Sequence, residues 1–306
     1  MNFNMKILAS YFNGFVLAYR AKKLITTIFL ITLFLALIIA IPLGSTIEKK
    51  AGNSMAFYSL LKDFNFSVYQ DFMNQFSGSI YPFISVAIWM GVFYLLFTIF
   101  FEGGILDILI RNERKYSLIT FWGASARYFS RFLRLAVYSV VIQIVIAIAV
   151  YIPVINVLDL VSANAESEKT LFCILLSGVV IHLIFFIFIL TVTDYAKIMM
   201  VENKKYKPLK TLFKSLGFVL RHFLSTYSLY LSLLIVPVIL FIIYFEFEAQ
   251  IVMSTGEKIF IIFVIQQVFI WCRIFIKTWI LGSEIFLYGK FTIKEKTVVK
   301  DVVFEI

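Results

Sequence analysis

The chain contains five long runs without a charged residue, and no other feature constrains its fold as strongly. The runs are Leu24–Ile47, Phe72–Phe101 (whose first third is polar and typical of turns), Leu135–Leu158, Thr170–Thr193 and Phe223–Phe245. An α-helix rises about 1.5 Å per residue, so about 20 apolar residues cross the hydrocarbon core of a bilayer, which is about 30 Å thick. Each run therefore predicts a transmembrane helix, because a single segment satisfies its backbone hydrogen bonds in lipid only as a helix.

A sixth run is interrupted by charge. It is uncharged from Ile259 to Cys272, then carries Arg273 and Lys277, and continues apolar to Glu284. We predict that it also spans the membrane, with the Arg273 guanidinium snorkelling towards the inner interface. With 61% apolar and only 15% charged residues, the composition excludes a soluble domain. The predicted fold class is all-α, a polytopic membrane protein in which residues 1–306 form a single membrane domain with six transmembrane helices.

Basic residues are concentrated in alternate connections. Residues 1–23 hold four basic and no acidic residues, residues 102–134 hold six basic against three acidic, and residues 194–222 hold seven against two. The other connections are neutral or acidic. Because Lys and Arg accumulate in cytoplasmic connections, both termini are predicted to lie in the cytoplasm. The net charge of +10 indicates contact with the lipid bilayer and its anionic headgroups, and nucleic acid is not expected as a partner.

Three units of the same layout follow one another, at approximately residues 1–110, 111–203 and 204–306. The fold is therefore predicted as three pseudo-repeated hairpins, each preceded by an amphipathic interfacial helix. These basic amphipathic segments are Lys6–Arg20, Ser117–Arg134 and Lys207–Arg221. Two interpretations of the segments stay open: a regulated or lipid-selective surface, or ordinary helices that lie in the headgroups before the chain crosses.

An acidic residue ends the second membrane helix of each unit. The three are Glu102, Asp194 and Glu284, separated by 92 and 90 residues. A carboxylate at the membrane boundary is costly unless it is paired, so one interpretation is three ion pairs that clamp the amphipathic segments to the hairpins. The alternative is a cytoplasmic vestibule for a cation or a polar headgroup. The arginines predicted to pair with the carboxylates are Arg20, Arg131 and Arg221.

The sixth run carries a polar stripe. Gln266, Arg273, Lys277 and Glu284 recur at spacings of seven, four and seven residues, which places them on one helical face. A guanidinium suits phosphate or carboxylate, so the stripe predicts an anion or headgroup site. The alternative is a buried ion pair of Arg273 with Glu102 or Asp194 on a neighbouring helix. The candidate ligand-binding residues are Gln266, Arg273, Lys277, Glu284, Glu102, Asp194 and His182.

Two further polar residues are predicted at mid-membrane depth, Gln143 in the third run and His182 in the fourth. Each is expected to hydrogen-bond across helices, and His182 is alternatively a proton relay. Cys173 and Cys272 have neither a disulfide-framework nor a metal-ligand spacing. No Gly-rich phosphate loop, H-E-x-x-H or G-x-S-x-G motif is present, so no catalytic residue, cofactor or metal is predicted. An intramembrane enzyme is not excluded, because such enzymes need none of these motifs.

The longest predicted external stretch extends from Gly44 to Ser79 and is rich in aromatic residues. We expect it to lie on the outer membrane interface, or alternatively to dock a membrane protein partner. Its aromatic residues are Phe57, Tyr58, Phe64, Phe66, Tyr69, Phe72 and Phe76.

Two short segments resemble known proteins. The inner end of the fourth run reads Thr193-Asp194-Tyr195-Ala196-Lys197-Ile198, and the third amphipathic segment ends Gly217-Phe218-Val219-Leu220-Arg221. They resemble a run found in a family of uncharacterised bacterial six-transmembrane inner-membrane proteins. The layout is also similar in outline to the membrane region of some glycerophosphodiester phosphodiesterases, whose catalytic barrel has no counterpart in these residues, so their activity is not expected here. The resemblance implies a helical bundle in the bacterial cytoplasmic membrane and supplies no substrate.

The expected function is that of a non-enzymatic, transporter-like or accessory permease component that handles a small polar solute or a lipid headgroup. The expectation rests on the repeat and on the stripe around Arg273. The alternative is a non-catalytic structural or assembly subunit whose 44–79 stretch docks a membrane partner. The two are distinguished by whether Gln266, Arg273 and Lys277 face a cavity or a packed helix.

Overall fold

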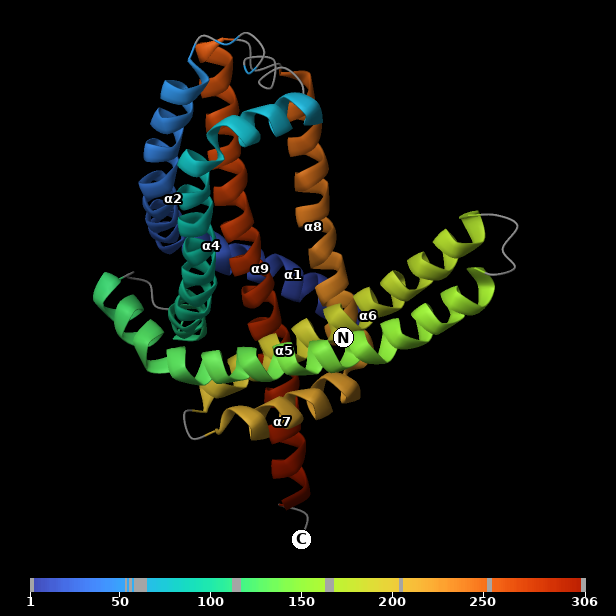
Figure 1. Cartoon of the computed structure of the whole chain (residues 1–306). Helices are drawn as coiled ribbons and strands as arrows, with labels where there is room; N and C mark the ends of the chain where they lie inside the picture. The colour runs from blue at the N-terminus through green and yellow to red at the C-terminus, as the bar shows by residue number, and fades with distance from the viewer. Residues whose placement is uncertain are drawn as a thin grey trace.

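The structure is a computed structural model, and it describes residues 3–52, 54, 57, 65–111, 117–162, 168–203, 206–251 and 255–303. The described part of the chain forms eight α-helices and no β-strand (Figure 1). Six of these helices are long and apolar enough to cross a membrane. The predicted all-α class is therefore confirmed, and so are six helices with the length and composition of membrane spans.

The six candidate spans are longer than the predicted runs, because each helix continues beyond its uncharged stretch. The interrupted sixth run, in particular, is one uninterrupted helix that carries both of its basic residues. The helices are α1 (Phe3–Arg20), α2 (Lys22–Ala51), α4 (Phe66–Arg111), α5 (Leu118–Ser162), α6 (Glu168–Glu202), α7 (Pro208–Arg221), α8 (Phe223–Gln250) and α9 (Gly256–Val303).

In the external stretch predicted from Gly44 to Ser79, the residues that the structure describes are largely helical. Its first residues continue α2, and its last residues belong to α4, so the prediction that the start of the second run is turn-like is wrong. Figure 1 shows the first turns of α4 lying across the top of the bundle before the helix bends downwards. Pro82 lies inside this helix, and proline is a usual cause of such a bend. Tyr58 and Phe64 lie outside the described residues, and Phe57 packs edge-on against Phe72 at 5.1 Å between ring centroids.

The three amphipathic segments differ in how they join the spans. The first and third form separate helices, α1 and α7, which are each divided from the following span by one non-helical residue, Ala21 or His222. The middle segment instead forms the first turns of α5 without a break. No proline occurs before Pro153 in α5 to interrupt the helix.

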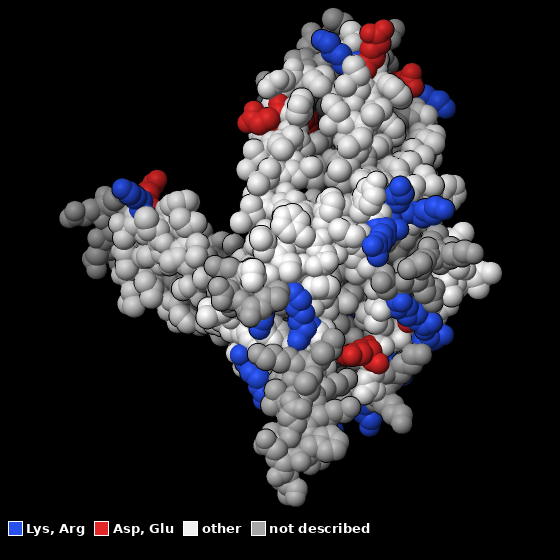
Figure 2. Space-filling model, turned by 180° about the vertical axis from the view of Figure 1, so that it is seen from behind, with Lys and Arg blue, Asp and Glu red and all other residues white. Residues whose placement is uncertain are grey.

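Figure 1 shows α7 at the lower end of the bundle, which we call the packed end. Buried side chains concentrate there. They include most of residues 101–109 of α4, 189–201 of α6 and 276–287 of α9. Away from this end most apolar side chains are exposed, as expected of helix faces that contact lipid. The hairpin of α5 and α6 leaves the packed end at a large angle to α8 and α9 (Figure 1). From behind it forms a separate arm (Figure 2).

Small residues bring two helix pairs into close contact. A Cβ atom built on Gly14 of α1 would lie 2.5 Å from the backbone nitrogen of Ser283 in α9, and a Cβ on Gly103 would lie 3.0 Å from Tyr128 in α5. The α1–α9 contact is reinforced by Trp279, whose indole nitrogen donates a hydrogen bond of 2.8 Å to the Tyr11 carbonyl. Lipid tails are as apolar as leucine, so close packing and interhelical hydrogen bonds stabilise a membrane bundle more than hydrophobic burial does.

Candidate functional site

A cavity of about 310 Å³ lies between α2, α4 and α9, and we call it the polar cavity. Its charged lining residues are Arg273, Lys277 and Glu102. The other lining residues are Ile28 and Thr32 of α2, Tyr94, Leu95, Thr98, Phe101 and Ile105 of α4, and Ile274 and Thr278 of α9. A few polar groups therefore meet walls that are otherwise apolar, which is the usual composition of a small-molecule site.

Helical spacing accounts for the polar groups of the cavity. On α4, Tyr94, Thr98 and Glu102 are four residues apart, and on α9 so are Arg273 and Lys277. Side chains four residues apart lie above one another on one face of a helix. Two facing helices thus each present a polar row to the same space.

Arg273 lies exposed at the cavity and donates a hydrogen bond of 3.0 Å from its guanidinium to the Tyr94 hydroxyl. The predicted alternative, an ion pair between Arg273 and a carboxylate, is not what the structure shows. Lys277, one turn further along α9, pairs with Glu102 instead. One N–H of a guanidinium is occupied by this bond with tyrosine, and a guanidinium has five, so Arg273 keeps donors for an anion.

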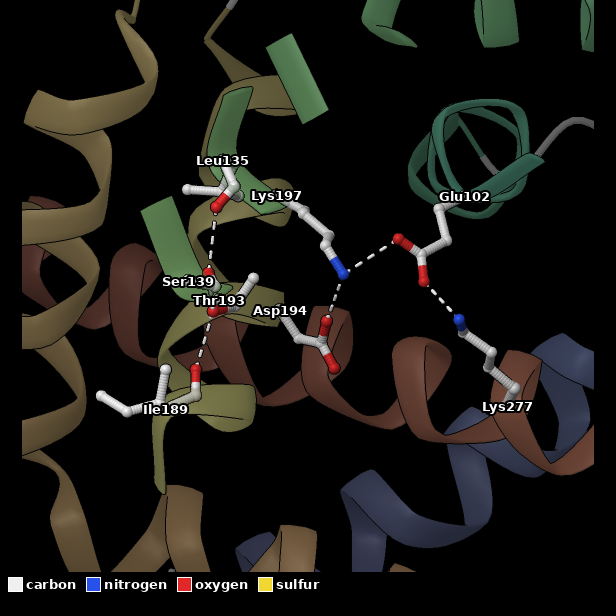
Figure 3. Close-up of polar contacts among 8 residues, drawn as sticks. All are labelled: Glu102, Leu135, Ser139, Ile189, Thr193, Asp194, Lys197 and Lys277. Carbon is white, nitrogen blue, oxygen red and sulfur yellow. Dashed lines mark hydrogen bonds and ion pairs between the residues drawn. The ribbon is translucent and has the colours of Figure 1, made fainter. Parts of the chain in front are cut away.

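Glu102 is the centre of an ion-pair network that joins α4, α6 and α9 (Figure 3). One carboxylate oxygen accepts from Lys277, and the other lies 2.9 Å from the ammonium of Lys197. Lys197 also donates a hydrogen bond of 2.8 Å to Asp194, one turn earlier on α6. The side chain of Glu102 is only 7% exposed, and a carboxylate buried to this extent stays charged only when it is paired.

The network contradicts the predicted partners of the carboxylates. Within the described part of the chain, the ion pairs of Glu102 and Asp194 are formed with lysines of α6 and α9. The predicted clamps between carboxylates and arginines of the amphipathic segments are therefore wrong for these two residues. The arginines that the sequence predicts as partners of the carboxylates are Arg20, Arg131 and Arg221.

Glu284 lies at the packed end, apart from the polar cavity. It is 1% exposed, and neither of its carboxylate oxygens has a hydrogen-bond partner among the described residues. It interacts electrostatically with Asp194 and Lys197. The structure thus brings the three matched carboxylates into one region of the bundle, but only Glu102 of the three lines the cavity.

The remaining candidates do not join the cavity. Gln266 is half-buried, two turns before Arg273, and is not among the lining residues. His182 packs between the rings of Tyr151 and Phe186, at 5.3 and 6.3 Å between centroids. It precedes Asp194 on α6 by twelve residues, which is about 18 Å along the axis. His182 is therefore too far from Asp194 to exchange a proton with it directly, and the structure does not support the proton-relay prediction.

A hydrogen bond across helices, predicted for Gln143, is confirmed. The amide nitrogen of Gln143 on α5 donates a hydrogen bond of 3.2 Å to the Phe186 carbonyl on α6. A second bond between the same helices, not predicted from the sequence, joins the hydroxyls of Ser139 and Thr193 at 2.8 Å (Figure 3). These bonds hold α5 against the helix that carries Asp194.

Two residues of the site were missed in the sequence analysis, Lys197 and Tyr94. Lys197 follows Asp194 by three residues and is only 9% exposed, although it stands in a stretch counted as a basic connection. Lys197 can be identified in the sequence because it is a basic residue within an apolar segment that continues to Val201. Tyr94 is identified by its four-residue spacing to Thr98 and Glu102.

The site offers ionic and hydrogen-bonding groups without a preformed metal centre. Among the described residues, no group of three or more His, Cys, Asp or Glu side chains is arranged to hold a metal ion. The chemistry present at the cavity is therefore a guanidinium, an ammonium, a carboxylate, a phenol and threonine hydroxyls. No protein family matches the chain, and neither curated proteins nor solved structures give a match.

Proposed function

We propose that the chain is a transporter-like or accessory permease component of a bacterial cytoplasmic membrane, with both termini in the cytoplasm, and that it handles a small polar solute or a lipid headgroup. The single observation that supports this most is the polar cavity, in which Arg273 and Lys277 face apolar walls within a set of membrane helices. Charged residues inside a membrane are rare and usually mark a path or site for a polar substrate. No bond-breaking step is part of the proposal.

The charge distribution supports the proposed orientation. In Figure 2 most Lys and Arg side chains of the visible face lie from its middle downwards, while most Asp and Glu side chains lie nearer the top. The positive-inside rule assigns the basic side to the cytoplasm. With six spans, an even number, both termini lie on that side. The α1 and α7 helices, at the basic side, fit the proposed role of interfacial helices at the start of the first and third hairpins.

Complementation of a deletion strain tests the proposal. We expect deletion to change the cellular level or leaflet distribution of a polar solute or lipid, measured by combined lipid and metabolite profiling. The parent gene and Lys210→Gln should restore the profile, whereas Arg273→Gln should not. Lys210 is a matched control because it is an exposed cation on α7, outside the cavity. Equal restoration by all three genes, with equal protein levels, would contradict the proposal.

A structural or assembly subunit is the second candidate, and one observation favours it. A groove of about 300 Å³ between α4 and α5 is lined only by apolar side chains: Phe93, Leu96, Phe97, Phe100, Trp122 and Phe129. Aromatic surfaces of this kind also serve as docking sites for other helices. Purification in mild detergent separates the two candidates, because a stoichiometric partner that is lost from a Phe97→Ala variant but kept by Arg273→Gln supports assembly.

A further inference from the structure

We propose that the polar cavity binds the phosphate group of an anionic phospholipid between Arg273 and Lys277, and that Glu102 competes with this phosphate for Lys277. The inference rests on the proposed function and names its ligand class and the residue that regulates occupancy. It is carried by the charges, the contacts and the walls of the cavity.

The charged groups that line the cavity favour an anion. Two are cationic, Arg273 and Lys277, and one is anionic, Glu102, which leaves one positive charge in excess. The two cations stand four residues apart on one face of α9, where Cβ atoms are about 5–6 Å apart, a separation that lets both side chains contact one phosphate group. A guanidinium also matches the geometry of phosphate oxygens in pairs. A bound anion would therefore neutralise the excess positive charge of the lining residues.

The lysine pair around Glu102 makes Lys277 exchangeable. The side chain of Lys277 is 46% exposed and contacts Glu102 from the cavity. The side chain of Lys197 is 11% exposed, and its ammonium lies 2.9 Å from the other carboxylate oxygen. When Lys277 turns to a ligand, Glu102 keeps Lys197 as its partner. No buried charge is left unpaired, so the exchange avoids the large penalty of breaking a buried ion pair. Glu102 thus pairs with Lys277 until an anion takes its place as the partner of this lysine.

The walls of the cavity favour a lipid over a soluble anion. Ile28, Leu95, Phe101, Ile105 and Ile274 surround the charged groups with apolar surface that suits the start of an acyl chain. The outer faces of α2 and α4 are exposed along most of their length, and in a membrane these faces contact lipid. A phospholipid that places its phosphate at these charged groups keeps its acyl chains in the apolar phase. Inorganic phosphate shares the binding chemistry but leaves the apolar walls unused.

Binding to the purified full chain tests the inference. The chain in neutral detergent is titrated with phosphatidylglycerol, with phosphatidylcholine of the same acyl chains, and with inorganic phosphate, and bound ligand is measured by native mass spectrometry. We expect phosphatidylglycerol to bind best. Arg273→Gln and Lys277→Gln should each bind phosphatidylglycerol about 10- to 100-fold more weakly, because each loses one charged hydrogen-bonding partner. Lys210→Gln should stay within about twofold of the parent, because a surface cation adds little.

Glu102→Gln provides the readout that a purely structural role would not move. Removing the competing charge frees Lys277, so phosphatidylglycerol should bind several-fold more tightly to Glu102→Gln than to the parent. Glu102→Gln is expected to stay folded because Lys197 keeps Asp194 as a partner. Arg273→Gln is expected to stay folded because Arg273 lies exposed. Circular dichroism of each variant verifies this.

The outcomes separate the inference from the proposed function. Unchanged or weaker lipid binding in folded Glu102→Gln overturns the competition, and equal affinity of parent and Arg273→Gln for phosphatidylglycerol overturns the lipid site. Binding of inorganic phosphate alone, with the same dependence on Arg273, overturns the lipid class while the proposed function stands. If Arg273→Gln also complements the deletion strain fully, the proposed function fails as well.

Discussion

Replacing Lys197 with methionine removes an ammonium that joins α4 and α6. Its nitrogen lies 2.9 Å from Glu102 and 2.8 Å from Asp194, and its side chain is 11% exposed. Methionine keeps a similar length without charge. Glu102 then retains Lys277, whereas Asp194 loses its ion pair. Removing one partner of a buried pair costs about 3–5 kcal/mol. The Asp194 side chain is 17% exposed, and partial hydration places the expected loss near the lower end of that range, about 3 kcal/mol.

Reversible unfolding in mixed detergent and dodecyl sulfate micelles, followed by circular dichroism, measures this free energy. Lys277→Met is the matched control, because it removes the other ammonium while Glu102 keeps Lys197, and its half-exposed side chain predicts a loss of about 1 kcal/mol or less. The double variant Lys197→Met/Asp194→Asn should recover stability relative to Lys197→Met, since it removes the charge left unpaired. Equal losses for Lys197→Met and Lys277→Met would refute the reasoning, as would a double variant less stable than the single one.

Two further predictions concern the contact of α1 with α9 and use the same unfolding assay. Gly14→Ala should lower the free energy of unfolding by about 1–3 kcal/mol through overpacking, because the added Cβ meets the Ser283 backbone. Gly123→Ala, with no atom near its added Cβ, should leave stability unchanged or higher, and equal effects of the two would contradict the close packing. Trp279→Phe should cost about 0.5–1.5 kcal/mol by losing the hydrogen bond to the Tyr11 carbonyl. An unchanged stability of Trp279→Phe would show that this bond contributes nothing.

Part of the candidate site can be predicted from the sequence, because the spacing of residues in a helix shows which of them share a face. The spacing of Arg273 and Lys277 predicted a shared face on α9, and both residues line the polar cavity. The same spacing argument included Gln266 and Glu284, which the cavity does not include. A stripe on a helix of 48 residues runs past several neighbours in turn, so residues on one face meet different environments along its length.

The sequence alone establishes the all-helical class and the six candidate spans, because a run of about 20 apolar residues has no other stable form in a bilayer. It could not determine which faces of the helices pack together. In a soluble protein the polar face points outwards, but here the faces towards lipid and towards protein are both apolar, so periodicity does not separate them. That Glu102 pairs with lysines of α6 and α9 follows from the packing of the helices, because a partner 95 or 175 residues away leaves no local signal.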